Sequence, residues 1–319
     1  MIVTVTLDPS LLVDYTADRL ELGAPNRVSR VRYRAGGRGL GVARLVHTFG
    51  HEVVAAGLAG GSAGELIRAY LVRAGVPAQF TRIGAESRRV VRVADAVTGQ
   101  LTSLDEPAPY ITTEELGRLA ADYRALLDGA TAVVLCGGLP AGLPGEIYAS
   151  LTSYANGAGV PVILDAGGSP FRHGAARGPA LAIPELAAGE LACGGTGFGV
   201  AGFGGMGELD LAGAGAVVLP VPRGVRVLTG AGEWQAKLPP DAGSAPGPEP
   251  AAEYAAGEAV REALVAGLVP GIELGWSWPD MLRNAVALAA SVSPSGEADL
   301  ADYEALLPTV AVTGPVPTA

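Results

Sequence analysis

Residues 131–165 read TAVVLCGGLPAGLPGEIYASLTSYANGAGVPVILD and contain the clearest fold signal of the sequence. The runs 131–136 and 160–165 are continuously apolar, which is typical of strands buried on both faces of a parallel sheet. Residues 144–156 between them are expected to form a helix. Strand, helix and strand in succession predict one crossover unit of a doubly wound α/β sheet.

The same alternation of strands and helices extends in both directions along the chain. Thr112 and Glu115 predict a capping box, and the apolar residues after them recur at the spacing of a helix with one buried face. Further strands are expected at 2–7, 27–34, 52–59, 87–94, 100–104, 216–219 and 225–229, and further helices at 40–49, 63–74, 254–268, 279–292 and 300–306. The glycine-rich segment 193–207 and the segment 239–250 predict loops, and we expect the tail after Thr313 to be frayed.

The bulk composition narrows the class of partner. The 319 residues carry 22 basic and 32 acidic side chains, a formal net charge of −10. An acidic chain has no general attraction for nucleic acid or an anionic membrane, so we expect neither partner. Two cysteines, no zinc-ligand spacing, no signal-peptide pattern and no apolar run of about 18 residues predict a reduced, cytoplasmic protein. No linker divides the chain, so residues 1–319 are expected to form one domain.

Two glycine-rich turns are candidate ligand sites. Residues 36–39 (GGRG) precede a predicted helix, whose N-terminus favours anions. Residues 137–140 (GGLP) follow the buried strand 131–136, and ligands of open α/β sheets bind at the carboxyl ends of strands. Each turn, taken alone, is equally consistent with an ordinary strand-to-helix connection.

Taken in order, these segments resemble the PfkB carbohydrate kinase family, within the ribokinase-like superfamily. The members most similar in pattern are 1-phosphofructokinase and tagatose-6-phosphate kinase. Residues 2–9 (IVTVTLDP) resemble the family's opening strand, which usually ends Leu-Asn-Pro. Residues 35–43 (AGGRGLGVA) resemble its signature Gly-Gly-Lys-Gly-x-Asn-Val-Ala. Residues 57–61, 105–107 and 135–144 also fall at the places the family pattern expects.

The resemblance implies a ribokinase-like fold with a small β lid over the sugar. The lid strands would lie within about 12–35 and 87–104 of this sequence. The resemblance also implies transfer of the ATP γ-phosphate to a hydroxyl of a phosphorylated sugar with the help of Mg²⁺, and a homodimer formed through the lid.

The catalytic segment of the family, Gly-Ala-Gly-Asp, is altered in this chain. It aligns with Ala255, Ala256, Gly257 and Glu258. The first three would form the anion hole for the transferring phosphoryl group, and Glu258 would be the general base. Glutamate is one methylene longer than aspartate, which shifts the carboxylate by about 1.5 Å at full extension.

The motifs of the nucleotide half are altered further. The family's Ser-Leu-Gly-x-x-Gly aligns with residues 219–224 (LPVPRG), where Gly224 is retained and two prolines remove amide donors. The family's Lys-Pro-Asn-x-x-Glu aligns with residues 183–188, where Ile183 replaces the lysine and Glu185 the asparagine. Glu185 and Gly224 are therefore the candidate nucleotide-binding residues, and no metal ligand is assigned.

The sugar-binding side retains some of the expected groups and loses others. The resemblance implies that Gly36, Gly37, Arg38, Gly41 and Arg88 bind the substrate, with Arg38 in place of the signature lysine. Gly41 stands where the signature has asparagine. Near the start of the chain, the family's aspartate falls on Leu12, which makes the neighbouring Asp14 a candidate replacement. Val90 stands where the family has a second asparagine.

Two functions therefore stay open at the level of sequence. One is a phosphosugar kinase homologue with impaired or absent catalysis that acts as a binding or regulatory protein and needs no ATP or Mg²⁺ cofactor when it is non-catalytic. The other is an active ATP- and Mg²⁺-dependent kinase that uses Glu258 as its base. Loss across three nucleotide and metal motifs favours the first, because a change of substrate alone would alter only the sugar side.

Overall fold

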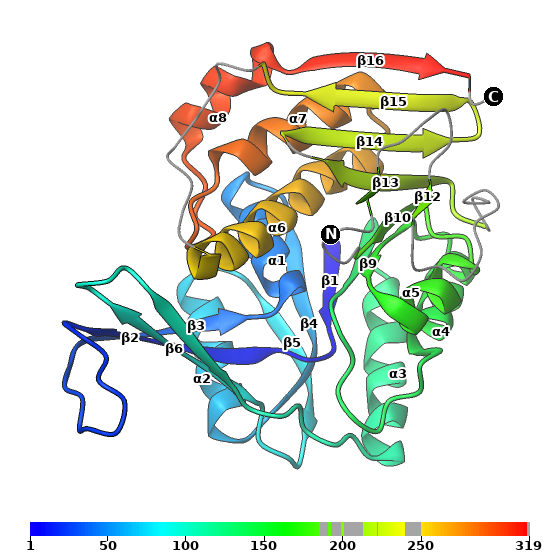
Figure 1. Cartoon of the computed structure of the whole chain (residues 1–319). Helices are drawn as coiled ribbons and strands as arrows, with labels where there is room; N and C mark the ends of the chain where they lie inside the picture. The colour runs from blue at the N-terminus through cyan, green and yellow to red at the C-terminus, as the bar shows by residue number, and fades with distance from the viewer. Residues whose placement is uncertain (186–190, 193–198, 201–212, 222, 240–249, 318–319) are drawn as a thin grey trace.

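The fold is a large sheet with helices on both faces and a small second sheet at one end (Figure 1). The computed structural model describes residues 1–185, 191–192, 199–200, 213–221, 223–239 and 250–317. Within these residues the large sheet has the strand order β16-β15-β14-β13-β10-β9-β8-β1-β4-β5. In this order, neighbouring strands pair in parallel from β13 through β10 to β5, and they pair antiparallel from β13 through β14 to β16. Their bounds are β1 Ile2–Thr6, β4 Val53–Gly60, β5 Ala78–Ile83, β8 Ala132–Cys136, β9 Val162–Ala166, β10 Leu181–Pro184, β13 Ala216–Val221, β14 Gly224–Thr229, β15 Gly232–Lys237 and β16 Ala311–Val316.

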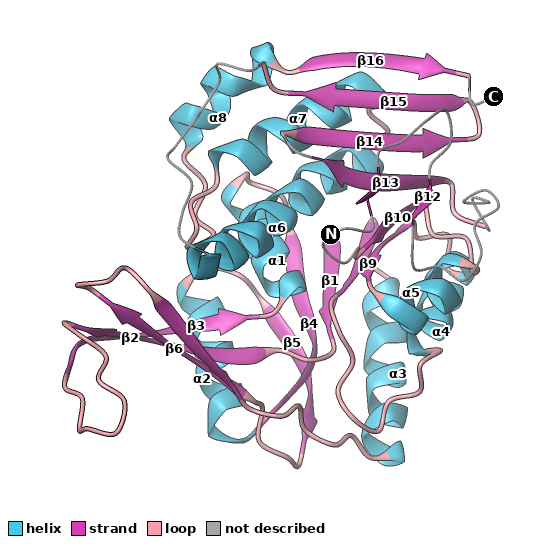
Figure 2. Cartoon of the chain, in the orientation of Figure 1, coloured by secondary structure: helices cyan, strands magenta, loops and turns pink. Residues whose placement is uncertain are grey.

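The central strands supply two separate cores, because successive side chains of a strand point to opposite faces of the sheet. In β8, Val134 belongs to the core formed with helices α1, α2, α6 and α7. Val133 and Leu135 belong to the core formed with α3, α4 and α5. Figure 2 shows these two layers of helices around the sheet. The helices are α1 Arg38–Thr48, α2 Gly61–Arg73, α3 Thr113–Leu127, α4 Ile147–Gly157, α5 Gly168–Ala175, α6 Pro250–Leu274, α7 Trp278–Ser291 and α8 Leu300–Leu306, with a 3-10 turn at Leu307–Thr309.

The small sheet projects from the main body beside α2 (Figure 1). Its strand order is β3-β2-β6-β7, with β2 and β6 parallel and the outer pairs antiparallel. The bounds are β2 Ser10–Ala17, β3 Val28–Gly36, β6 Arg89–Asp95 and β7 Leu101–Asp105. A separate two-stranded pair joins β11 Leu191–Ala192 to β12 Gly199–Val200.

The direction of strand addition reverses at β1. Strands β4 and β5 lie on one side of β1, and β8, β9 and β10 lie on the other. A parallel sheet leaves a crevice at the carboxyl ends of its strands where the order reverses, and ligands bind there. The ends of β1 and β8 therefore mark the place for a site.

Several expectations from the sequence are confirmed. The doubly wound α/β fold is present. Thr112 caps α3, with Glu115 bonded back to the Thr112 amide, so the capping box is also correct. The expectation of a frayed tail after Thr313 was wrong, because residues 311–316 pair with β15 at the edge of the sheet. Most of the glycine-rich segment 193–207 lies outside the described residues, as does nearly all of the loop expected at 239–250.

Candidate active site

A cavity of about 580 Å³ lies at the crevice where the strand order reverses. Its floor is formed by the ends of β1 and β8 and by the start of α1. Helix α6 forms one wall, and the small sheet and the loop 294–296 close the other side. Gly137 and Gly138, from the turn after β8, line it, and a Cβ atom at either glycine would meet nothing within 4 Å.

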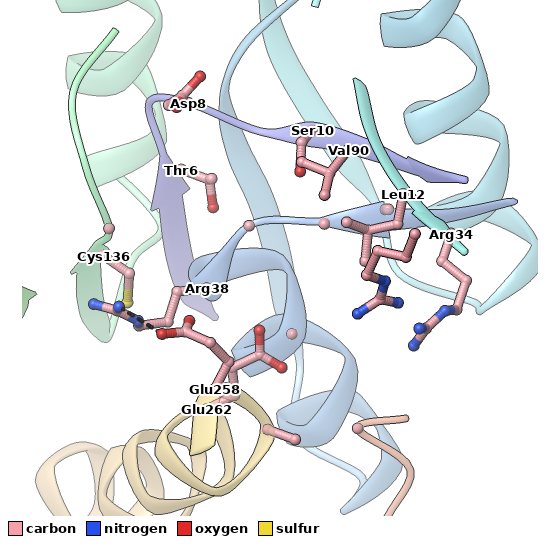
Figure 3. Close-up of a pocket in the computed structure, with 18 of the residues that line it drawn as sticks. Thr6, Asp8, Ser10, Leu12, Arg34, Arg38, Val90, Cys136, Glu258 and Glu262 are labelled. Carbon is pink, nitrogen blue, oxygen red and sulfur yellow. Dashed lines mark hydrogen bonds and ion pairs between the residues drawn. The ribbon is translucent and has the colours of Figure 1, made fainter. Parts of the chain in front are cut away.

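The glycines of the turn before α1 are required by close packing. Gly37 is the N-cap of α1 and has φ 118°, a conformation that favours glycine. A Cβ atom there would lie 2.7 Å from Thr6 Cγ2, and one at Gly36 would lie 2.6 Å from Ser10 Oγ. This turn therefore brings the backbone of α1 directly against β1 and β2, with the Arg38 side chain at the cavity (Figure 3).

Arg38 is the centre of a buried ion-pair network. Its guanidinium lies 3.4 Å from Asp165, 3.2 Å from Glu258 and 3.5 Å from Glu185, and the residue is only 7% exposed. Burial by itself lowers the pKa of Arg38, but the three carboxylates outweigh burial and hold the pKa above its ordinary value. Arg38 therefore stays charged and ties together β9, the residue after β10, and α6.

A second arginine completes this network. Arg261 of α6 donates to Asp165 Oδ1 at 2.5 Å and 2.8 Å, and to the carbonyl of Ile183 at 3.1 Å. Asp165 is fully buried, and both Arg38 and Arg261 pair with its carboxylate. The two arginines face three carboxylates, so the five side chains carry a net charge of −1 when all are ionised.

The small sheet holds a second cluster, in which Asp14 bonds to two arginines. Asp14 lies 2.8 Å from Arg34 and 2.6 Å from Arg92, and Arg34 also donates to the carbonyl of Ser295 at 2.8 Å. Burial would raise the pKa of Asp14, but its bonds to Arg92 and Arg34 hold the pKa below its usual value. Both arginines line the cavity and Asp14 does not. Asp14 therefore acts here as a positioning residue for the arginines.

Arg88 has a carboxylate partner of its own. Its Nε donates to Asp8 Oδ2 at 2.9 Å, and both residues line the cavity. Burial raises the pKa of Asp8, and the charge of Arg88 only partly offsets this effect. The family resemblance places asparagine at position 8, so the aspartate adds a charge that offsets Arg88.

Glu262 also lines the cavity, and sequence reasoning missed it. It lies four residues after Glu258, so both carboxylates point from the same face of α6 (Figure 3). Burial raises the pKa of Glu262 to about 8; Glu258 adds to this rise, and Arg44 opposes it. The i, i+4 spacing of the two glutamates was the available signal.

Buried polar atoms without a hydrogen-bond partner gather at this cavity. Among the described residues, Thr6 Oγ1, Asp8 Oδ1, Arg38 Nε and Arg44 Nε are such atoms, and all four residues line the cavity. The Asp165 Oδ2 atom, beside Arg38, is another. Buried polar atoms are nearly always paired in proteins, so this concentration marks the cavity as a candidate site for polar ligand groups or water.

The remaining candidate residues divide between the cavity and elsewhere. Glu185 and Glu258 line the cavity, as do Gly36, Gly37, Gly41, Arg38 and Arg88. Gly224 does not line it; a Cβ atom there would overlap the Ala236 carbonyl oxygen, so close packing in the β14–β15 hairpin explains this glycine.

The expected anion hole falls inside a helix. Ala255 is the sixth residue of α6, and Ala256 and Gly257 follow it. From the fifth residue onward, helical amides donate to the carbonyl four residues earlier. The side chains of Ala255 and Ala256 lie outside the described residues, and a Cβ atom at Gly257 would meet open space.

Neither a three-residue metal-ligand cluster nor a membrane-spanning helix occurs among the described residues. No group of three His, Cys, Asp or Glu side chains in this part of the chain is arranged to hold a metal ion. No described helix is both long enough and apolar enough to cross a membrane.

The fold and the cavity together define an α/β protein with a cavity at the reversal point of its sheet. A model of the pfkB family carbohydrate kinases matches residues 10–194, which is more than half of the chain. The chain belongs to this family, as the sequence resemblance predicted.

Solved structures share the fold over nearly the whole chain. A putative phosphofructokinase from Staphylococcus aureus is 22% identical with a TM-score of 0.79, and 98% of each chain is covered. A possible 1-phosphofructokinase from Thermotoga maritima is 19% identical with a TM-score of 0.76, covering 98% of this chain and 99% of that one. Phosphofructokinase-2 from Escherichia coli, in complex with fructose-6-phosphate, is 20% identical with a TM-score of 0.74, covering 96% and 98%.

Proposed function

We propose that this chain is a pfkB-type protein that binds a phosphorylated sugar and has lost effective ATP-dependent phosphotransfer. The observation that carries the proposal is the Arg38 network. The candidate base Glu258 and the signature cation Arg38 bond to each other, 3.2 Å apart, and Arg38 also bonds to Asp165 and Glu185. A carboxylate bonded to a guanidinium is less available to a substrate hydroxyl, and a guanidinium surrounded by three carboxylates attracts a phosphate poorly.

Further observations support the loss of phosphotransfer. The amides of Ala255, Ala256 and Gly257 lie within α6, where helical hydrogen bonds use them. The described residues offer no three-ligand metal cluster, and the five charged side chains around Arg38 sum to −1, which repels a polyphosphate. In these respects the described residues do not fit Mg·ATP, so we derive no catalytic step that involves it.

Sugar-phosphate binding is supported by the opposite side of the cavity. Arg34 and Arg92 share the single carboxylate of Asp14, which leaves one unit of positive charge facing the cavity. A phosphate group pairs well with two guanidinium groups held in this way. One structural neighbour, phosphofructokinase-2 from Escherichia coli, was solved in complex with fructose-6-phosphate, which is the class of ligand proposed here.

The alternative is an active kinase with Glu258 as its base. Glu258 lines the cavity, and its side chain is 36% exposed, so a substrate hydroxyl could reach it. The test is ADP release with Mg·ATP and, in turn, fructose 1-phosphate, fructose 6-phosphate and tagatose 6-phosphate. We expect no turnover by the wild type or by Glu258→Asp. A kcat above about 1 s⁻¹, an ordinary value for kinases, would establish the active kinase instead.

The proposal includes a homodimer formed through the small sheet. Strand β3 is an edge strand and exposes Val28, Val31 and Tyr33. An exposed apolar edge is a natural pairing surface. Light scattering after size exclusion should give twice the chain mass, and Val31→Lys should give a monomer; a monomeric wild type would refute this part.

A further inference from the structure

Gly41 of α1 lies directly against the Glu262 carboxylate of α6. This glycine is the fourth residue of α1 and faces α6 across the cavity. A Cβ atom built at Gly41 would overlap the Glu262 carboxylate, so any side chain at position 41 and the present position of Glu262 exclude each other. Position 41 is where the family signature has asparagine. The polar group at this point of the cavity therefore comes from α6 in this chain.

The neighbouring residue of α6, Arg261, anchors the helix beside the cavity. The family pattern has lysine at position 183, where this chain has Ile183. The Arg261 guanidinium reaches this point from α6 and donates to the Ile183 carbonyl and to Asp165. These bonds fix α6 against β9 and β10, and Glu262, the next residue of the helix, is thereby held at its place in the cavity lining.

Glu262 has the properties of a group that binds a ligand. It lines the cavity, and within the part of the chain that the structure describes it has no hydrogen bond or ion pair. The charged groups that face it are Arg38 and Arg44 of α1, Arg34 of β3 and Glu258 of its own helix. Burial raises its pKa to about 8, so near pH 7 the protonated form predominates and offers both a donor and an acceptor.

Figure 3 shows Glu258 pointing toward Arg38, whereas Glu262 points to the side of the cavity on which Arg34 lies. We propose that Glu262 is a ligand-binding residue that bonds a hydroxyl group of a small anionic polyol whose acidic group pairs with Arg34 and Arg92. The assignment deepens the proposed function and rests on it, because the phosphorylated sugar is the ligand. A neutral carboxyl suits an anionic ligand, since it bonds a hydroxyl without repelling the phosphate.

The placement of Glu262 is tested without any ligand. Gly41→Ala should be less favourable for stability in the wild type than in the Glu262→Ala background, because the Glu262 carboxylate must leave the space that the alanine side chain takes. Gly117→Ala is the matched control, since Gly117 lies within α3 and its Cβ atom would meet nothing within 4 Å. The control should be neutral or stabilising, as alanine is the better helix former. Equal effects of Gly41→Ala in both backgrounds would overturn the placement.

The binding role is tested by calorimetry at pH 6.5 with fructose 1-phosphate, fructose 6-phosphate, tagatose 6-phosphate and inorganic phosphate. Glu262→Ala should weaken the best phosphosugar by about 10-fold or more, the usual effect of losing one hydrogen bond to a hydroxyl. The same variant should leave inorganic phosphate unchanged, and Glu262→Gln should retain most of the affinity. Arg92→Met should weaken both probes.

The two possible failures are distinguishable. A phosphosugar that binds wild type and Glu262→Ala equally would overturn the role of Glu262 and leave the proposed function intact. A wild type that binds none of the phosphosugars would overturn the proposed function, and the role of Glu262 with it.

Discussion

Replacing Arg38 with methionine is the most informative single change. Methionine retains much of the apolar stem and removes the guanidinium, which leaves Arg261 alone against the carboxylates of Asp165, Glu185 and Glu258. Removing one partner of a buried ion pair costs about 3–5 kcal/mol. Asp165 keeps Arg261, and Glu185 is 51% exposed and reaches water, so the cost should fall to about 2–3 kcal/mol.

The free energy of unfolding is measured by urea denaturation followed by circular dichroism. A loss of about 2–3 kcal/mol should also lower Tm by about 4–6 °C for a chain of this size. Arg118→Met is the matched control, because the Arg118–Glu114 pair is exposed and should contribute less than about 1 kcal/mol. Glu258→Gln should reduce the cost of Arg38→Met, because the two residues are in contact.

A free energy of unfolding for Arg38→Met within about 0.5 kcal/mol of the wild type would contradict this expectation, because ordinary surface substitutions have effects of that size. Arg38 would then not be a structural tie, and its guanidinium would be free to serve a phosphate group. The proposal of lost phosphotransfer would lose its main support.

Three further predictions concern stability. The pKa of Glu262 is about 8 in the folded protein, against an ordinary value of 4.5. The folding stability linked to its proton is therefore fully present below pH 4.5 and lost as the pH rises through 8, with an upper limit of about 5 kcal/mol that partial exposure reduces to about 1–3 kcal/mol. Glu262→Gln should abolish this loss when the free energy of unfolding is compared at pH 5 and pH 9. The pKa of Asp14 is lowered in the folded protein, so its ion pairs stabilise the fold above the unfolded pKa of 3.8, and about 1 kcal/mol of stability is lost as the pH falls through the folded pKa. Asp14→Asn should therefore reduce the dependence of the free energy of unfolding on pH between pH 5 and pH 2. The same pH dependence in the variant and the wild type would contradict the ion pairs of Asp14 with Arg34 and Arg92. Gly57→Ala should cost more than about 3 kcal/mol in urea unfolding, because φ is 140° and its Cβ atom would overlap the Thr6 carbonyl oxygen; a wild-type midpoint would contradict that packing.

Local sequence patterns were sufficient to predict the buried central strands and the capped start of α3. The apolar runs at 131–136 and 160–165 are β8 and β9 with their flanks, and Thr112 with Glu115 caps α3. Strand β16 was missed because Ala311–Val316 contains glycine and proline and its burial comes only from pairing with β15. Strand β5 was missed for a related reason, since Ala78–Ile83 has mixed polarity and lies at the other edge of the sheet.

The candidate site shows where sequence reasoning ends. The family pattern assigned Arg38, Arg88, Glu185 and Glu258, and the structure brings all four to one cavity. It could not give their partners, because Arg38 and Asp165 are 127 residues apart and their contact depends on the tertiary fold. Charge partners decide whether a retained residue is free to bind a ligand, so the pattern alone could not separate a kinase from a binding protein.

The same limit applies to residues that changed their place. Asp14 was a candidate replacement for the carboxylate missing at Leu12. It lies two residues further along β2, where it bonds to Arg34 and Arg92 and does not line the cavity. Glu262 lies in a segment that the family pattern did not mark. The overlap of its carboxylate with the space beside Gly41 appears only when α1 and α6 are packed together.

Binding of a phosphosugar without binding of nucleotide can be measured by thermal unfolding of the wild type with and without Mg·ATP at about 1 mM, beside a parallel series with the phosphosugars. We expect no rise in Tm with Mg·ATP and a clear rise with at least one phosphosugar. A nucleotide bound with a Kd of about 10 µM would add about 2.7 kcal/mol under these conditions, a rise of about 5 °C. A rise of that size with Mg·ATP would show that the nucleotide site works and would favour the active kinase over the binding protein.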